Sequence, residues 1–262
     1  LAAVTIRDRL GRDDEVLAVF PADHFIRDVE RFRRSVTSAA EQAVGGAIVT
    51  IGIEPTVPET GYGYIRTGDD IGPGILAADA FVEKPDRDTA LRYVTNGNYL
   101  WNSGMFCFRI DTILEEIRRQ LPELGTQLED LAPAVASGDE AALSDVFLRI
   151  APVSIDYGVM EGARNVQVVP ARFGWSDVGH WDALPSVSET DAEGNVCIGD
   201  VVAVDCHDSV LVGHDHRVLA AVGLERLVVV DTEDALLVAP RERVQEVREI
   251  VDRLKGRNST IV

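Results

Sequence analysis

The sequence predicts a mixed α/β domain followed by a smaller β-rich unit that ends in a helix. Residues 16–53 contain a short apolar run, an amphipathic segment and a second apolar run. This strand, helix, strand order is typical of a βαβ unit with a parallel sheet. Towards the end of the chain the pattern changes to short β-rich runs at close intervals. We therefore expect one domain over residues 1–188 and a second over residues 189–262, with enough chain to bury a core.

The first βαβ unit is predicted from its apolar spacing and its breaks. Residues 16–20 form an apolar run typical of a buried strand, and the run ends in Pro-Ala-Asp-His. A helix follows and is ended by Gly45 and Gly46. Residues 47–53 form the next buried strand. The apolar residues of the helix recur at helical spacing: Phe25, Val29, Phe32, Val36 and Ala43.

Further elements continue this domain. Residues 54–68 are punctuated by proline and glycine and are predicted to be a loop that enters a strand. Next come a strand that ends at Pro85 and a helix that runs through Leu91. Another strand covers residues 99–110, and Gly104 inside it indicates a β-bulge.

The rest of the chain is predicted to be helical at first and then β-rich. Residues 111–150 are mainly helical, with breaks at Pro122 and Pro133, and residues 165–171 form a strand. Short apolar runs such as VVAVD and LVVVDT then predict a small all-β unit. The final helix has one apolar face, made of Val244, Val247, Ile250, Val251 and Leu254.

Composition excludes several classes of protein. A formal net charge of −19 argues against nucleic acid, whose phosphates need a basic face. No run of about 18 apolar residues and no charged-then-apolar leader is present, so we expect no membrane span, no signal peptide and a cytoplasmic protein. Cys107, Cys197 and Cys206 lie far apart, which argues against a disulfide framework. Because of this net negative charge, a phosphorylated ligand must be bound by a metal ion, backbone amides or a few focused cations. Lys84 stands out, because only Lys84 and Lys255 are lysines and the other basic residues are arginines.

Two aspartates stand where a ligand or metal ion can bind. Asp23 follows the first predicted strand, at the edge where open α/β sheets bind ligands. Asp177 lies between Trp175 and Trp181 in a short acidic turn. Each has a structural alternative, because aspartate often caps a helix or a helical turn. If the two carboxylates meet, a divalent cation must offset their repulsion, and Mg²⁺ is the default ion for oxygen ligands.

Polar residues in three further motifs suit a sugar phosphate. Glu83 and Lys84 are neighbours in FVEKP, and both reach one site only if the strand twists or ends there. The carboxylate can accept hydrogen bonds from sugar hydroxyls and the ammonium can bind a phosphate, although an exposed ion pair explains the motif as well. Asn102 in WNSGMF can donate and accept at once, which suits a pair of hydroxyls. The glycines of PETGYGYI let a ligand approach the backbone closely or simply form a turn.

Six motifs, in register, resemble those of mannose-1-phosphate guanylyltransferases of the short bacterial type. The likeness runs from about residue 16 to the end of the chain. It implies a Rossmann-like nucleotidyltransferase domain, similar to glycosyltransferase A, with a short β-helical tail. It also implies an enzyme that joins mannose 1-phosphate to GTP, giving GDP-mannose and pyrophosphate. The motifs are PADH at 21–24, PETGYGYI at 58–65, FVEKP at 81–85, WNSGMF at 101–106, SIDYGVME at 154–161 and FGWSDVGHW at 173–181.

The resemblance implies roles for individual residues. Asp23 and Asp177 look like the two Mg²⁺ ligands, and Lys84 like the residue that binds the sugar phosphate. These three would be the catalytic residues. The sugar itself would be bound by Tyr62, Gly63, Glu83 and Asn102.

One feature of this family does not appear in the sequence. Such enzymes begin with a glycine-rich segment of the G-x-G-T-R-L type, which binds the triphosphate and guanine, and no such segment precedes Leu1. We therefore expect the chain to lack this part, to be inactive by itself and to leave the base specificity open. Gly162 also stands where many relatives carry a basic residue. Another sugar-nucleotide pyrophosphorylase and a catalytically silent regulatory subunit are the alternatives, and the oligomeric state, including a homodimer, is left open.

Overall fold

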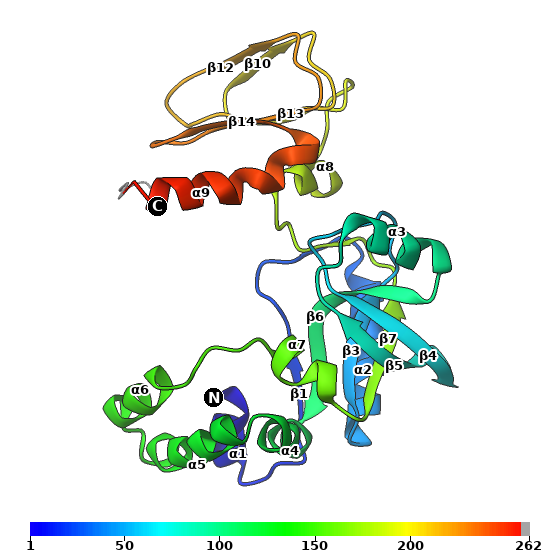
Figure 1. Cartoon of the computed structure of the whole chain (residues 1–262), viewed down its shortest axis with the longest axis vertical. Helices are drawn as coiled ribbons and strands as arrows, with labels where there is room; N and C mark the ends of the chain where they lie inside the picture. Colours follow the sequence, from blue (N-terminus) through cyan, green and yellow to red (C-terminus); the bar gives the residue numbers. More distant parts are fainter. Residues whose placement is uncertain (258–262) are drawn as a thin grey trace. The chain divides into compact units, whose positions relative to one another are not determined.

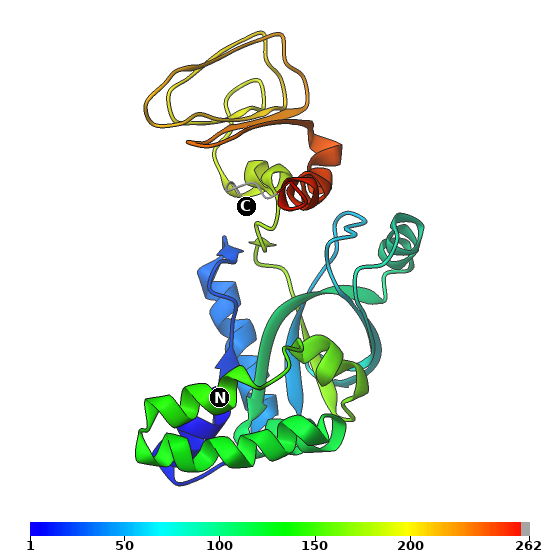
Figure 2. The same ribbon diagram turned by 60° about the vertical axis from the view of Figure 1, so that its left-hand side comes forward.

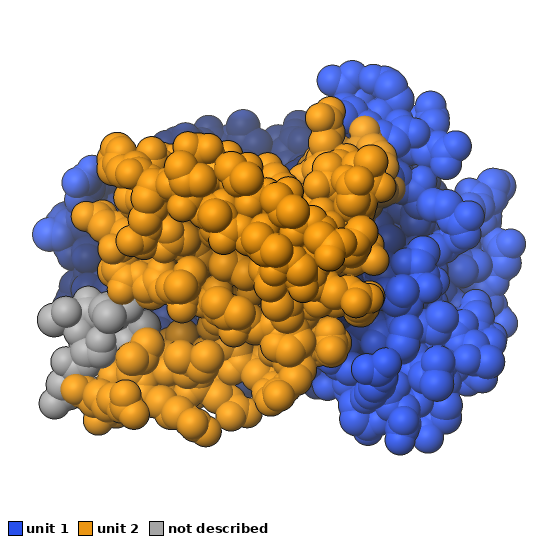
Figure 3. Space-filling model, turned by 90° about the horizontal axis from the view of Figure 1, so that it is seen from above, with its two compact units in different colours: residues 1–22, 28–173 blue, residues 23–27, 174–262 orange. Residues whose placement is uncertain are grey.

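The chain forms two compact units. The computed structural model describes residues 1–257. Unit 1 comprises residues 1–22 and 28–173, and unit 2 comprises residues 23–27 and those from 174 onward, coloured separately in Figure 3. The predicted fold class is confirmed, because an α/β unit is followed by a β-rich region and a final helix (Figure 1). The division into domains at residue 188 stays a prediction.

Unit 1 is built on a six-stranded mixed sheet. Strands β3 and β7 are parallel, whereas the other neighbouring pairs are antiparallel. The sheet curls so that β4, the last strand in the order, also bonds to β6 (Figure 2). The order is β1 (Val16–Val19), β6 (Tyr99–Arg109), β3 (Ile48–Ile53), β7 (Val166–Ala171), β5 (Ile75–Val82) and β4 (Tyr64–Gly72).

The two strands of the predicted βαβ unit run in the same direction, but the sheet is mixed rather than parallel, because β6 lies between them. The predicted strand, helix, strand unit exists as β1, α2 (Val29–Val44) and β3. However, β6 lies between β1 and β3 and is antiparallel to both. The end of the predicted strand is also less buried than its sequence indicated, since Val19 of β1 is 43% exposed and Phe20, which follows it, is 40% exposed. An apolar run can therefore form an exposed strand as well as a central one.

The predicted bulge in β6 is confirmed. Thr50 of β3 pairs with Phe106, but Gly52, two residues on, pairs with Asn102. The extra residues of β6 include Gly104 at φ 68°, a left-handed conformation that favours glycine. The bulge shifts the register by two residues, so that Asn102 lies opposite Gly52.

The helices of unit 1 form two groups. Helix α2 packs against β1, β3, β6 and β7, and it begins at Val29 because the Asp28 side chain accepts a hydrogen bond from the Arg31 N–H at 2.9 Å. The second group contains α1, α4, α5 and α6, which lie together in Figures 1 and 2. The remaining helices are α1 (Ala2–Leu10), α3 (Arg87–Asn96), α4 (Ile110–Gln120), α5 (Pro122–Ser137), α6 (Glu140–Leu148) and α7 (Ile155–Gly158), with a 3₁₀ turn η1 at Met160–Gly162.

Helical structure over residues 111–150 is confirmed, but one predicted break is not. Pro122 separates α4 from α5 and occupies the first turn of α5, where its missing N–H costs no helical bond. Pro133, by contrast, lies inside α5, so the helix continues through it. None of the described helices is long and apolar enough to cross a membrane. The three cysteines, which lie within the described residues, are free, as expected.

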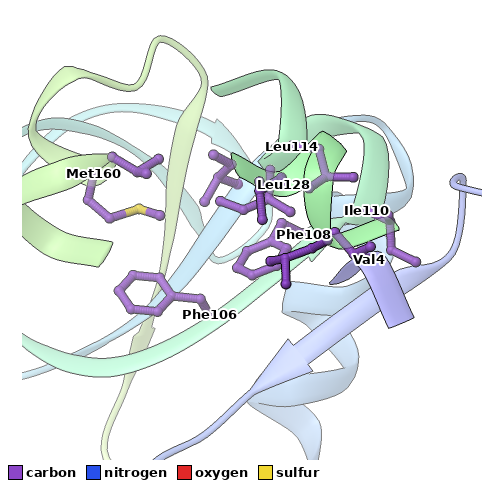
Figure 4. Close-up of a cluster of buried hydrophobic side chains, with 11 residues drawn as sticks. Val4, Phe106, Phe108, Ile110, Leu114, Leu128 and Met160 are labelled. Carbon is purple, nitrogen blue, oxygen red and sulfur yellow. The ribbon is translucent and has the colours of Figure 1, made fainter. Parts of the chain in front are cut away.

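One hydrophobic cluster joins the helices of the second group to the sheet (Figure 4). Phe106 and Phe108 of β6 are 2% and 4% exposed, and they meet side chains from α1, α4, α5 and η1. Burying side chains of this size contributes about 1.5–3 kcal/mol each. The buried members are Val4, Ile48, Phe106, Phe108, Ile110, Ile113, Leu114, Leu128, Leu131, Val159 and Met160.

Unit 2 contains a β-helix, which confirms the β-rich tail. Strands β9, β11 and β13 pair in parallel in one stack, and β10 and β12 pair in parallel in another. Val196, Val210 and Val228 stand in register and form its buried interior. The strands are β9 (Val196–Ile198), β10 (Val201–Val204), β11 (Val210–Val212), β12 (Leu219–Val222), β13 (Leu227–Asp231) and β14 (Leu236–Pro240), followed by η3 (Arg241–Glu246) and α9 (Val247–Lys255).

Unit 2 also contains a short two-stranded ladder. Strand β2 (Phe25–Ile26) pairs antiparallel with β8 (Trp175–Ser176), although about 150 residues separate the two strands in sequence, and both belong to unit 2. The predicted helix from Phe25 was therefore too long at its start, because Phe25 and Ile26 bond to β8 instead. After β8 the chain continues into η2 (Trp181–Ala183) and α8 (Leu184–Val187).

Candidate sugar phosphate and metal sites

Three of the predicted sugar-binding residues lie together in unit 1. Gly63 precedes β4, Glu83 follows β5, and Asn102 lies on β6. A Cβ atom built on Gly63 would lie 2.4 Å from Glu83 Oε2 and 3.4 Å from Asn102 Cβ. Gly63 also accepts a backbone hydrogen bond from the Asn102 N–H at 2.8 Å. A side chain at residue 63 would therefore displace the Glu83 carboxylate, whereas glycine lets the carboxylate lie against this backbone.

Glu83 and Lys84 reach the same side, as the sequence required for a shared site. Strand β5 ends at Val82, so the alternation of side chains stops before Glu83. Lys84 then adopts φ 45°, a left-handed conformation that is costly for a residue with a side chain. As a result, Lys84 Nζ lies 3.3 Å from Glu83 Oε1.

The ion pair between these two residues does not explain the strained backbone. Lys84 is 55% exposed and Glu83 19% exposed, and a pair of this kind contributes little to stability. Residues in such sparsely populated backbone conformations cluster at active sites and ligand-binding sites. The exposed ion pair that the sequence allowed as an alternative does form, and it leaves both groups available to a ligand.

Aromatic side chains line the neighbouring backbone. The Tyr62 and Trp101 rings meet edge to face with their centroids 5.2 Å apart. Trp101 is 6% exposed, so it belongs to the core and holds Tyr62 in place. Burial raises the pKa of the Tyr64 hydroxyl, which donates to the Glu59 carbonyl at 2.8 Å. Tyr62 thus lies beside Gly63 on a segment tied to the sheet.

Asp156 is a residue of this cluster that the sequence did not single out. Its Oδ1 accepts a hydrogen bond from Asn102 Nδ2 at 2.7 Å. Asp156 lies on α7, within the SIDYGVME motif, and α7 is capped by Ser154. The motif was a signal, but nothing in the local sequence says that its carboxylate meets Asn102, which is 54 residues away.

The two predicted metal ligands both belong to unit 2 and flank the β2–β8 ladder. Phe25 pairs with Ser176, so one further step of the antiparallel register brings His24 opposite Asp177. Trp175 Nε1 donates to His24 Nδ1 at 3.1 Å, and the two rings meet edge to face. Asp23, which precedes β2, and Asp177, which follows β8, therefore lie at the same end of the ladder.

The pKa of His24 is affected by the carboxylates of both Asp23 and Asp177. Burial lowers the pKa of His24, and the charges of Asp177 and Asp23 oppose this shift. Two residues from distant parts of the chain thus act on one imidazole. The alternative that Asp23 caps the next helix was wrong, because Asp28 caps α2.

Asp177 forms a tight turn. Its Oδ1 accepts from the Gly179 N–H at 2.9 Å, and the Ser176 hydroxyl accepts from the Val178 N–H at 3.1 Å. Val178 adopts φ 48°, a rare conformation for a β-branched residue. The alternative that Asp177 caps a helical turn was wrong, because η2 begins after His180 and has no side-chain cap.

The carboxylate donors suit Mg²⁺, although residues 1–257 contain no group of three or more His, Cys, Asp or Glu side chains that could hold a metal ion. Magnesium is usually bound by one or two carboxylates together with waters and substrate phosphates. A pair such as Asp23 and Asp177 fits that donor set, since neither needs a third protein ligand. Their assignment as ligands is a proposal.

Comparison with known proteins decides the family. A family model described as nucleotidyl transferase matches residues 1–194. The chain belongs to the nucleotidyl transferase family. A second model, described as a MannoseP isomerase/GMP-like beta-helix domain, matches residues 199–254 and agrees with the parallel strands of unit 2.

Individual relatives support the predicted resemblance. A putative mannose-1-phosphate guanylyltransferase of Vibrio cholerae is 43% identical over 98% of this chain and 55% of its own length. The mannose-1-phosphate guanylyltransferase of Escherichia coli is 41% identical over the same shares. A solved structure described as mannose-1-phosphate geranyltransferase from Thermus thermophilus is 41% identical with a TM-score of 0.84, covering 97% of this chain and 73% of that one. The chain spans about half the length of the curated relatives it matches.

The position of His24 generates the first testable prediction. Replacing Asp177 or Asp23 with Asn should lower the pKa of His24 further, because each carboxylate favours the charged imidazole. An NMR titration of His24 measures this directly. Asp70→Asn, in unit 1, is the control and should leave the titration unchanged. If the pKa of His24 is unchanged in both aspartate variants, neither carboxylate acts on the imidazole and the prediction is wrong.

The same shift predicts a pH dependence of stability. Burial holds the pKa of folded His24 below its ordinary value of about 6.5. The unfolded chain therefore binds protons more readily near that pH, and the stability contributed by neutral His24 is lost as the pH falls through this range. Urea unfolding at a series of pH values, from above 6.5 downward, gives the free energy of unfolding of the parent and of His24→Gln. The parent should lose more stability than the variant as the pH falls.

Proposed function

We propose that the chain forms the sugar phosphate-binding and metal-binding parts of a mannose-1-phosphate guanylyltransferase. Such an enzyme joins mannose 1-phosphate to GTP and releases GDP-mannose and pyrophosphate. Relatives that carry this name match nearly all of the chain, which supports the proposal. The observation that carries it is the meeting of Gly63, Glu83, Lys84 and Asn102 in one part of unit 1.

Each residue of the unit 1 cluster supplies a different kind of contact. Glu83 accepts hydrogen bonds from sugar hydroxyls, and Asn102 donates and accepts beside it. Gly63 leaves room for a sugar ring against the backbone, with Tyr62 alongside. Lys84 has the ammonium that binds the phosphate of mannose 1-phosphate. Its exposed position lets the phosphate reach it without displacing buried groups.

Asp23 and Asp177 of unit 2 are the groups that would hold Mg²⁺. When bound, the ion would orient the phosphates and offset their negative charge. The chain's own contribution is to fix the two carboxylates beforehand. The β2–β8 ladder positions Asp23, and the bond from the Gly179 N–H orients Asp177. The presence of Mg²⁺, like the binding of GTP, is part of the proposal.

The reaction requires no nucleophile from the protein. A phosphate oxygen of the sugar phosphate attacks the α-phosphorus of GTP in line, and pyrophosphate leaves. Catalysis then depends on positioning and on neutralising charge. We place this reaction in the cytoplasm, where GTP is available.

A substrate panel tests the proposed function. The purified gene product is incubated with Mg²⁺, mannose 1-phosphate and GTP, and GDP-mannose and pyrophosphate are measured. Other sugar 1-phosphates and nucleoside triphosphates are compared under the same conditions. We expect the pair of mannose 1-phosphate and GTP to give the highest kcat/KM. A higher value for another pair would mean another sugar-nucleotide pyrophosphorylase, and no turnover of any pair would mean a silent subunit.

Lys84 provides a test of the phosphate contact. In the gene product, Lys84→Ala should raise the KM for mannose 1-phosphate by roughly 10- to 100-fold, the effect of losing one charged hydrogen bond, and change the KM for GTP far less. Lys255→Ala, which removes the other lysine of the chain, is the matched control. Steady-state kinetics with each substrate varied in turn measure both constants. If the KM values for mannose 1-phosphate and GTP change equally, Lys84 does not bind the phosphate of the sugar.

Asp177 provides a test of the metal proposal. Asp177→Asn removes the charge but keeps an oxygen that can accept from the Gly179 N–H, so the turn should survive. Activity should fall by roughly 10²-fold or more, as expected for a lost electrostatic contact. Asp70→Asn is a close control, since Asp70 Oδ1 accepts from the Gly72 N–H in the same way at 3.0 Å.

Thermal melts distinguish a metal ligand from a structural residue. The Asp177→Asn variant should melt like the parent without ligand but lose most of the stabilisation that Mg²⁺ and nucleotide give the parent. A variant that melts well below the parent without ligand, yet turns over normally once folded, would make Asp177 structural only.

A further inference from the structure

The side-chain amide of Asn102 is held at both ends by the protein. Its Nδ2 donates to Asp156 Oδ1 at 2.7 Å, and its Oδ1 accepts from the Gly104 N–H at 3.2 Å. An asparagine amide has two N–H groups and two lone pairs on its oxygen. One N–H and one lone pair therefore remain beyond these two bonds.

The two bonds also decide which way round the amide lies. Reversing it would place Asn102 Oδ1 against the Asp156 carboxylate and its NH₂ group against the Gly104 N–H. Both contacts would be repulsive, because each would pair like with like. The backbone amide at the bulge and the carboxylate on α7 thus specify a single orientation, and the carboxylate supplies the stronger, charge-assisted bond.

Both partners of Asn102 are mounted on rigid elements. Gly104 belongs to the bulge of β6, inside the sheet. Asp156 lies on α7, which leads directly into Val159 and Met160, 3% and 1% exposed in the main cluster of unit 1. A side chain held between such supports keeps its orientation before a ligand arrives, which is what precise binding requires.

The orientation matters because of what stands beside Asn102. A Cβ on Gly63 would contact both the Glu83 carboxylate and the Asn102 side chain. Neighbouring hydroxyls on a sugar each need a donor or an acceptor at a defined place. An amide that turned over would exchange its donor and acceptor and lose one of these bonds.

We propose that Asp156 is a positioning residue for the sugar phosphate. It fixes the Asn102 amide so that the remaining N–H and lone pair meet adjacent hydroxyls of the sugar, next to Glu83. This inference rests on the proposed function, since it takes a sugar 1-phosphate as the ligand of the unit 1 cluster. It assigns Asp156 no contact with the reacting atoms.

A double-mutant cycle tests this role. Binding of mannose 1-phosphate to the purified gene product is measured by calorimetric titration for the parent, Asp156→Asn, Asn102→Ala and the double variant. Asparagine at 156 keeps the size but can donate or accept, so it no longer specifies one orientation of Asn102. We expect Asp156→Asn to weaken binding by about tenfold, as for a lost charged hydrogen bond. In the Asn102→Ala background the same change should have almost no effect, because Asp156 acts through Asn102.

Glu140→Gln is the matched control, because Glu140 is likewise an acidic residue in the first turn of a helix of unit 1. All titrations are run below the melting transition of every variant. The inference is wrong, while the proposed function stands, if the parent binds mannose 1-phosphate and the Asp156→Asn variant binds it equally well. The inference is also wrong if Asp156→Asn weakens binding to the same degree in the parent and in the Asn102→Ala background. If the parent does not bind mannose 1-phosphate, the proposed function fails and the inference fails with it.

Discussion

Strand β6 bonds to β1, β3 and β4, and this shared backbone links the core of unit 1 to its polar cluster. Phe106 and Phe108 on its second half are buried in the hydrophobic cluster, while Asn102 on its first half faces Asp156. The bulge at Gly104 lies between these two parts of the strand. Because it places three residues of β6 opposite one of β3, Asn102 and Phe106 stay on the same face, opposite Gly52 and Thr50. The position of the cluster thus depends on how the strand is packed at its other end.

Two motifs of the sequence contain residues with a strained backbone. Lys84 and Val178 both have positive φ, which costs on the order of 1–3 kcal/mol for a residue with a side chain. At Lys84 the conformation turns the ammonium toward Glu83, and at Val178 it closes the turn that orients Asp177. In each place the strained residue lies beside a carboxylate. Surrounding structure must supply the compensating stability, as the sheet and the β2–β8 ladder do here.

Local patterns predicted much of this chain, and long-range pairing accounts for what they missed. The bulge at Gly104 was predictable because a glycine inside a strand often marks the point where the ladder is interrupted. The start of α2 was misplaced because Phe25 fits a helical pattern equally well, and only its partner Ser176 decides for a strand. Likewise, no local signal places β6 between β1 and β3. The register of a sheet depends on residues that are far apart in sequence, which a single chain does not display.

The same reasoning applies to the polar residues. Glu83 and Lys84 were found because an acid and a lysine stand side by side before a strand-ending proline in a chain with two lysines. Asp156 was missed because the role proposed for it depends on its hydrogen bond to Asn102, which the local sequence does not show.

With a net charge of −19, the chain has little positive charge to spare for a phosphate. Lys84 is held by Glu83 at 3.3 Å, so in the proposed function an arriving phosphate competes with that carboxylate for the ammonium. Loosening this pair leaves Glu83 free to accept a sugar hydroxyl, so that one substrate satisfies both partners of the ion pair it separates.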